Sequence, residues 1–145
     1  MKIVIDSNIL FSALLSPDNR YKTLLYLSDY TFYSCNFLFV EIFKYKNKIK
    51  AVSKLTENEI LIQLGSIVSK IHFVNEDIIP KEIFNRAYEL CKDIDEKDTP
   101  FIALSIFLDA YFITGDKKLF DGLKNKGFDK VMSIKTMEKL QESKK

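Results

Sequence analysis

The chain begins with the stretch KIVIDSN (residues 2–8), in which three β-branched apolar residues precede an acid and two turn-forming residues. Such a run predicts a short buried strand that ends at Asp6. Further strand-like runs follow at 31–35, 71–74, 111–114 and around Val131, with helix-like segments between them. Strands that alternate with helices indicate a parallel sheet covered on both faces. We therefore predict an α/β fold with a central, mainly parallel sheet of about five strands.

The helices between these strands carry local start signals. Thr56-Glu57-Asn58-Glu59 is a capping-box pattern, because the Thr and Glu side chains can each bond the other's backbone amide. Apolar spacing predicts one helix over 37–50, which places Glu41 on an early turn. The pattern predicts a single domain over 1–141 and a frayed tail over 142–145.

Composition excludes several classes of protein. The 22 Lys and Arg residues nearly balance the 20 Asp and Glu residues, so overall charge gives no reason for nucleic-acid binding. No apolar run approaches the roughly 20 residues of a membrane span, and no signal-peptide pattern opens the chain. Cys35 and Cys91 lie far apart in sequence, and we expect a reduced, cytoplasmic protein in which both are buried.

Four acids are expected to meet at one edge of the sheet. Asp6 and Asp116 follow strands, Asp98 precedes a helix start, and Glu41 lies early in the helix after the second strand. The ligand crevice of a parallel sheet lies beyond the carboxyl ends of its strands. Two carboxylates about 4 Å apart repel by roughly 4 kcal/mol at an effective dielectric of 20, so a cluster favours a divalent cation. Oxygen ligands suit Mg²⁺ or Mn²⁺, which activate water for phosphodiester hydrolysis.

A simpler interpretation exists for each aspartate, since Asp at a strand end can cap the next helix or close a turn. Capping does not require Glu41, and it does not predict the acidic turn at Asp116. Asp95 is an additional acid that could share the role of Asp98, and Glu96 and Asp121 also lie nearby in sequence.

The basic residues and the histidine give weaker signals. Lys117 and Lys118 follow Asp116 and could contact a substrate phosphate, or they could simply be exposed. The lysines between 44 and 50 would spread over several helix faces, and we expect them to be solvated. His72 is the only histidine, which excludes a mechanism based on two imidazoles, and we expect it to be structural.

The ordered motifs of this chain resemble those of PIN-domain nucleases. The motifs are VIDSNIL (residues 4–10), Glu41, DTPFIAL (residues 98–104) and TGDK (residues 114–117). The resemblance covers nearly the whole chain and implies a PIN-like α/β/α sandwich. It further implies a Mg²⁺- or Mn²⁺-dependent endoribonuclease that cleaves single-stranded or structured RNA, commonly the VapC-like toxin of a toxin-antitoxin pair, with an antitoxin protein as partner and often a homodimer. In that family, metal is bound by the acids matching Asp6, Glu41, Asp98 and Asp116, while Asn8 and Thr114 match supporting positions.

Other functions fit the residues less well. An aspartate-nucleophile phosphatase needs a second acid two residues after Asp6, where this chain has Asn8. A receiver domain needs adjacent acids after its first strand, and a nucleotide-binding module needs a glycine-rich loop. The main alternatives are a catalytically weak PIN-like scaffold that binds RNA or protein, and an RNA processing or decay nuclease outside toxin-antitoxin systems.

Overall fold

The sheet at the centre of the molecule is parallel throughout. The computed structural model describes residues 1–143, in which five strands lie in the order β3-β2-β1-β4-β5. The strands are β1 (Lys2–Ile5), β2 (Thr31–Cys35), β3 (Ile71–Val74), β4 (Tyr111–Ile113) and β5 (Val131–Met132). Every neighbouring pair runs parallel. The predicted α/β fold with about five strands is confirmed.

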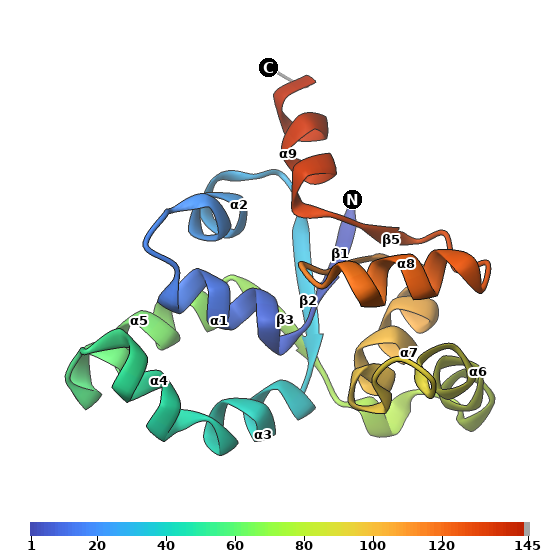
Figure 1. Cartoon of the computed structure of the whole chain (residues 1–145), viewed down its shortest axis with the longest axis horizontal. Coiled ribbons are helices and arrows are strands. Elements are labelled where there is room, and N and C mark those ends of the chain that lie inside the picture. The colour runs from blue at the N-terminus through green and yellow to red at the C-terminus, as the bar shows by residue number, and fades with distance from the viewer. Residues whose placement is uncertain (144–145) are drawn as a thin grey trace.

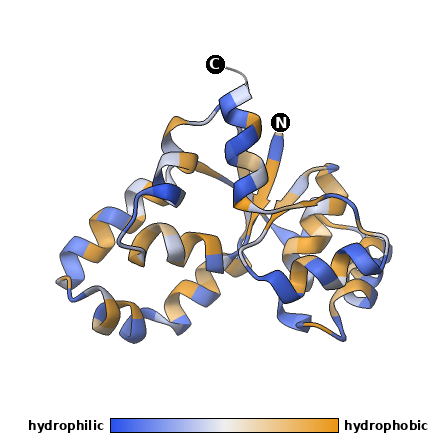
Figure 2. Cartoon of the chain, turned by 45° about the horizontal axis from the view of Figure 1, so that its top comes forward, coloured by the Kyte–Doolittle hydropathy of each residue, from blue (hydrophilic) through white to orange (hydrophobic). Residues whose placement is uncertain are grey.

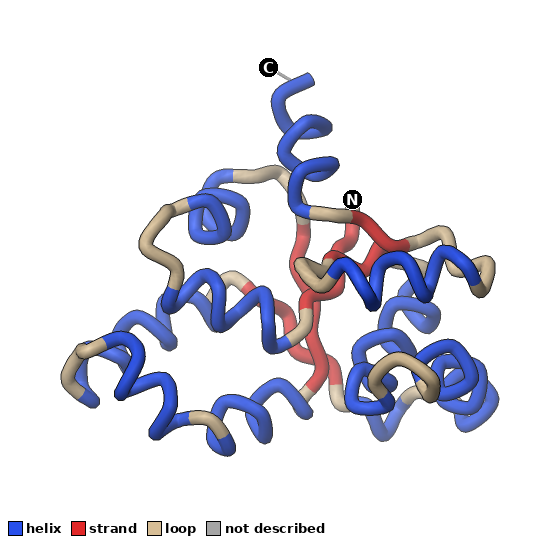
Figure 3. Tube along the Cα trace, viewed as in Figure 1, coloured by secondary structure: helices blue, strands red, loops and turns tan. Residues whose placement is uncertain are grey.

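Helices cover both sides of this sheet, as Figures 1 and 3 show. The helices on one side are α1 (Ser7–Leu15), α2 (Arg20–Leu27), α3 (Phe37–Lys44), α4 (Lys46–Ser53) and α5 (Glu57–Val68). The helices on the other side are α6 (Lys81–Cys91), α7 (Thr99–Leu108) and α8 (Lys117–Asn125). Two short 3-10 helices, η1 (Glu76–Ile78) and η2 (Glu96–Asp98), precede α6 and α7, and α9 (Ile134–Ser143) comes last.

The prediction of one helix over 37–50 is wrong, because the chain bends at Tyr45. The backbone of Tyr45 (φ −102°, ψ 12°) leaves the helical region between α3 and α4. Its ring packs edge-on against Phe11 of α1, with 5.8 Å between the ring centroids. Both helices contact α1, so the bend keeps the two segments beside the same partner helix.

The ends of the other helices follow their sequence signals closely. The capping box of α5 is present: the Thr56 hydroxyl accepts from the Glu59 amide, and Glu59 accepts from the Thr56 amide, both at 3.2 Å. Helix α9 starts at Ile134 and continues to Ser143, so it includes the first half of the tail that was expected to fray. Residues 144 and 145 of that tail lie outside the described residues.

The core lies on both faces of the sheet. Ile3, Val4 and Ile5 of β1 are fully buried, and α7 buries five consecutive residues, from Phe101 to Ser105, against β1, β2 and α6. In Figure 2 the strands are mainly apolar, whereas the helices alternate between apolar and polar segments. Among residues 1–143, no helix combines the length and apolar character that crossing a membrane requires.

Both cysteines are buried, as expected, and neither forms a disulfide. Burial raises the pKa of the Cys35 thiol and of the Cys91 thiol to about 12. Neither thiol is therefore ionised near neutral pH, and a structural role fits both residues.

Candidate active site

Asp6 stands between β1 and α1 with almost no exposure to solvent. Its Oδ1 accepts a hydrogen bond from the amide of Ile9 at 3.0 Å and caps α1. The side chain is 1% exposed, and its Oδ2 has no hydrogen-bond partner among the described residues. Burial raises the pKa of Asp6 to about 7, backbone hydrogen bonds oppose this, and the charge of Asp116 adds to it. The ionised form of Asp6 therefore needs a nearby positive charge.

Asp116 follows β4 and lies in the open. Its Oδ1 accepts from the amides of Lys118 (3.0 Å) and Leu119 (3.3 Å), so it caps α8. The hydroxyl of Thr114, a buried residue, accepts from the amide of Asp116 at 3.1 Å. Thr114 thus fixes the turn that presents Asp116.

Glu41 and Asp98 line one cavity of about 320 Å³, together with Asp95 and Asn8. We call it the α3 cavity, because Glu41 enters it from α3. Glu41 is 7% exposed, so it is not the solvent-facing helix acid of the alternative interpretation. Asp98 comes from the other side of the sheet, where η2 meets α7.

The electrostatics of Asp98 connect it to the rest of the site. Burial raises the pKa of Asp98 to about 7, and the charges of neighbouring acids raise it further. These neighbours are Asp6, Asp95, Asp116 and Glu41. Because every other predicted ligand acts on Asp98, the four acids share one field at the carboxyl end of the sheet.

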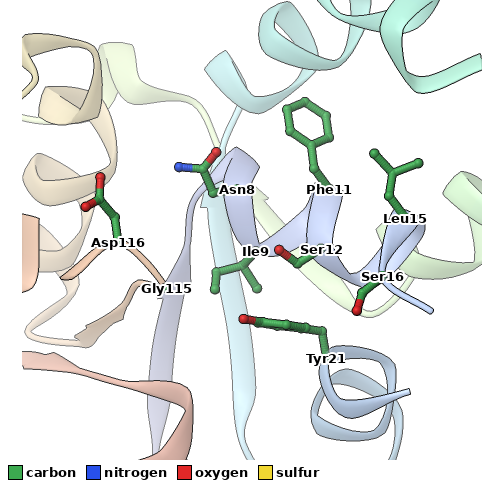
Figure 4. A pocket seen from close by; sticks show the side chains of 9 residues that line it. All are labelled: Asn8, Ile9, Phe11, Ser12, Leu15, Ser16, Tyr21, Gly115 and Asp116. Atoms are coloured by element: carbon green, nitrogen blue, oxygen red, sulfur yellow. The ribbon is translucent and has the colours of Figure 1, made fainter. Parts of the chain in front are cut away.

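Asp116 borders a second cavity, of about 480 Å³, which Tyr21 of α2 and residues of α1 also line (Figure 4) and which we call the α2 cavity. Asn8 lines both cavities, so it stands between Asp116 and the pair of Glu41 and Asp98. Within residues 1–143, no three His, Cys, Asp or Glu side chains lie close enough together to enclose a metal ion directly. The acids form an open site instead of a closed cage.

Two lysines in the α3 cavity are functional candidates that sequence reasoning missed. Lys48 of α4 and Lys97 of η2 line it beside Glu41 and Asp98. Lys48 was expected to be merely solvated, and its position depends on the bend at Tyr45. Lys97 precedes Asp98 directly, so that adjacency could have identified it.

The remaining sequence candidates lie at the edge of the site or outside it. Asp95 is exposed, accepts from the amide of Lys97 at 3.1 Å and lines the α3 cavity, so it stays a candidate partner of Asp98. Lys117 and Lys118 are exposed at the start of α8 and line neither cavity. His72 is exposed on the edge strand β3, where its ring lies 5.3 Å from that of Tyr33.

A parallel α/β/α sandwich with acids gathered at the carboxyl ends of its strands defines a class of small proteins with an acidic, oxygen-lined site. The PIN domain family model matches residues 4–142 of this chain. The chain therefore belongs to the PIN domain family.

Two solved structures share the fold of this chain. One chain of a toxin-antitoxin complex from Klebsiella pneumoniae is 19% identical with a TM-score of 0.61, over 91% of this chain and 97% of that chain. The second is a chain of VapBC2 from Rickettsia felis, in a complex bound to a DNA fragment from the VapBC2 promoter. It is 14% identical with a TM-score of 0.63, and the match covers 92% of this chain and 97% of that chain. Sequence comparison with curated proteins gives no significant match. At these identities the structural likeness establishes the fold, and the PIN-like sandwich expected from the motifs is confirmed.

Proposed function

We propose that this chain is a Mg²⁺- or Mn²⁺-dependent endoribonuclease that cleaves single-stranded or structured RNA. The observation that carries the proposal is the Asp6 carboxylate, which is buried, has an unpartnered Oδ2, and lies in the field of Asp98 and Asp116. A buried acid in this state is unfavourable unless a cation neutralises it. Membership of the PIN domain family supports a nuclease.

We also propose that the chain is the toxin of a toxin-antitoxin pair, with a protein antitoxin as partner and a cytoplasmic homodimer as its free form. The support for this part is the likeness to two chains from toxin-antitoxin complexes, each covered over nearly its full length. Induced expression in bacteria tests it. Growth should stop with the native chain and continue with Asp6→Asn, and equal growth in both cases would contradict the toxin assignment.

The residues present fit a hard divalent cation. The proposed ligands are the carboxylates of Asp6, Glu41, Asp98 and Asp116, of which no more than two would bind the ion directly and the others through waters. The free Oδ2 of Asp6 supplies one uncommitted oxygen. Mg²⁺ gives up its water reluctantly and is often held by one or two carboxylates with waters between, so an open arrangement of acids suits it. Mn²⁺ takes the same oxygen ligands. When bound, the ion would lower the pKa of a water and stabilise charge on phosphate oxygens.

The side chains around the acids would bind the phosphate and handle the proton. Lys48 and Lys97 line the α3 cavity and would attract the RNA backbone once a cation neutralises the acids beside them. Asn8 has an amide that can donate to a phosphate oxygen. As a water oxygen bonds to phosphorus and the ester bond to the leaving oxygen breaks, the partly exposed Asp98 carboxylate would accept the proton of the water. The leaving oxygen would take a proton from solvent.

The decisive experiment is cleavage of a mixed-sequence single-stranded RNA by the purified chain with Mg²⁺, Mn²⁺ or EDTA. Asp6→Asn and Asp116→Asn should both slow cutting, Asp6→Asn by the larger factor. Asp121→Asn is the matched control, because Asp121 is an exposed acid on α8 that lines neither cavity. We expect metal-dependent cutting at the full rate only in the native chain and in Asp121→Asn.

Two outcomes would contradict this function. Equal cutting in EDTA would show that the reaction needs no metal. Full activity in both site variants would show that it does not need these acids. If the native chain cuts no RNA, calorimetric titration with Mn²⁺ decides the metal site, since binding that is lost in Asp6→Asn supports it and the absence of binding overturns it.

A further inference from the structure

The α2 cavity differs in chemistry from the α3 cavity, although α1 separates them and both include Asn8, Phe11 and Leu15. Among residues 1–143, no Lys or Arg lines the α2 cavity, and its one charged residue is Asp116. The α3 cavity contains Lys48 and Lys97. The α3 cavity also contains Glu41, Asp95 and Asp98, so a phosphate fits there when the proposed cation neutralises these acids beside the two lysines. The α2 cavity offers no positive charge of its own and favours an uncharged ligand part.

An aromatic ring and several uncommitted polar groups line the α2 cavity. Tyr21 is partly buried on α2, and Figure 4 shows its ring below Ile9 and Ser12 with the hydroxyl directed towards Gly115. A Cβ atom on Gly115 would lie 3.5 Å from that hydroxyl, which places the ring edge beside the turn that presents Asp116. The ring therefore lies next to the proposed active site.

The polar groups of this cavity have spare hydrogen-bonding capacity. The Tyr21 hydroxyl, the Ser12 hydroxyl and the Asn8 amide make no side-chain hydrogen bond with other described residues. Phe11, in contrast, is committed to its contact with Tyr45 and forms part of the wall. A flat ring with neutral donors and acceptors around it is the combination that binds single-stranded bases, by stacking on the face and hydrogen bonding at the edge.

We propose that the α2 cavity is a nucleobase subsite, in which Tyr21 stacks on one base of the RNA while Ser12 and Asn8 contact the edge of that base. The inference rests on the proposed function. The volume of the α2 cavity, about 480 Å³, lies within the range of roughly 300–1,000 Å³ that is usual for small-ligand pockets. Because Asn8 and Asp116 border the cavity, the bound base belongs to a nucleotide beside the scissile phosphate.

The test is an abasic scan of a cleaved RNA. Each nucleotide within three positions of the cut is replaced in turn by an abasic ribonucleotide, and kcat/KM is measured. For the native chain we expect one position at which the abasic RNA is cleaved about 10-fold more slowly or worse, since one stacked base contributes a factor of this size. Tyr21→Leu should show that loss with intact RNA and no further loss at the abasic position, whereas Tyr21→Phe should behave as the native chain.

The controls separate a subsite from a structural effect. Tyr26 lies on the same helix as Tyr21, but its hydroxyl is hydrogen-bonded to that of Ser66 at 2.8 Å, outside the cavity. Tyr26→Leu should therefore still cleave the abasic RNA more slowly than the intact RNA. Ser12→Leu fills the cavity and leaves residue 21 a tyrosine, so it tests the proposal even if Tyr21→Leu does not fold. It should lower cleavage of intact RNA with no further loss at the abasic position, and unchanged cleavage would overturn the subsite. If the abasic substitution lowers kcat/KM by the same factor in Tyr21→Leu as in the native chain, the two losses are independent and the subsite is overturned.

Failure of the proposed function would be recognisable, because the native chain would then cut no RNA. The subsite is tested in that case by fluorescence anisotropy of the same oligonucleotides in EDTA. Weaker binding of one abasic RNA to the native chain, with no such difference in Tyr21→Leu, supports the base subsite without nuclease activity. Equal binding of all RNAs overturns it.

Discussion

An aspartate follows β1 and another follows β4, and the two differ in burial and in hydrogen bonding. Asp6 and Asp116 each follow one of two neighbouring parallel strands, and each caps the helix that comes next. Asp116 is exposed, and two backbone amides bond its Oδ1. Asp6 is buried, accepts one such bond and keeps Oδ2 unpaired. Capping therefore accounts for the local structure at Asp116 and leaves half of the Asp6 carboxylate unexplained.

This difference separates the stability of the chain from its function. A buried polar atom without a partner costs about 1–3 kcal/mol, so Asp6 destabilises the chain when no cation is present. Such atoms are rare in folded proteins, and a catalytic role or a bound ion accounts for many of them. The end of β1 is therefore where metal should affect both stability and activity, whereas Asp116 should affect mainly activity.

The largest effect is expected on catalysis. Asp6→Asn should lower kcat/KM for RNA cleavage by about 100- to 1,000-fold, the usual consequence of removing one preorganised charged group. Asp116→Asn should cause a smaller loss, because Asp116 is exposed and water can replace part of its interaction. Cleavage rates in Mn²⁺ measure both values. A larger loss for Asp116→Asn would reverse the comparison.

The next effect concerns stability in EDTA at pH 8. Asp6→Asn should raise Tm by about 5 °C, since it removes a buried charge while Asn can still accept from the Ile9 amide. Asp116→Asn should leave Tm within about 1 °C, because Asn and Asp cap helices equally well. Thermal unfolding followed by circular dichroism measures the difference. A lower Tm for Asp6→Asn would show that the buried charge of Asp6 does not destabilise the chain.

The same burial should make the stability of the chain depend on pH. The pKa of Asp6 and the pKa of Asp98 are raised to about 7 in the folded chain, from an ordinary value of 3.8, so the folded state binds more protons between these values. Their contribution to stability is fully present below about pH 4 and is lost as pH rises through 7. Tm in EDTA should therefore fall from pH 5 to pH 8, and fall less in Asp6→Asn, in which only Asp98 still titrates in this range. A Tm that rises over this range contradicts the prediction, and excess Mn²⁺ should oppose the fall.

The positions of the strand-end acids were predictable because their signals are local. A β-branched run followed by Asp6-Ser7-Asn8 specifies a strand and a cap within seven residues, and the turn before Asp116 does the same. The bend at Tyr45 was not predictable, since the apolar spacing continues through it and only the contact with Phe11 marks it. The separation of the acids between two cavities likewise depends on where α1 lies, which is a tertiary property.

The smallest effect is expected at the edge of the sheet that is furthest in strand order from the β1–β4 pair. His72 on β3 is exposed, stacks beside Tyr33 and lines neither cavity, so His72→Ala should change kcat/KM by less than about 2-fold. The loss of one aromatic contact should lower the free energy of unfolding by about 0.5 kcal/mol. Cleavage assays and urea titration of the same preparation measure both. No acid in the proposed site depends on the His72 ring. Abolished cleavage in a folded His72→Ala chain would therefore indicate that the active site lies at the β3 edge of the sheet and not at the strand-end acids.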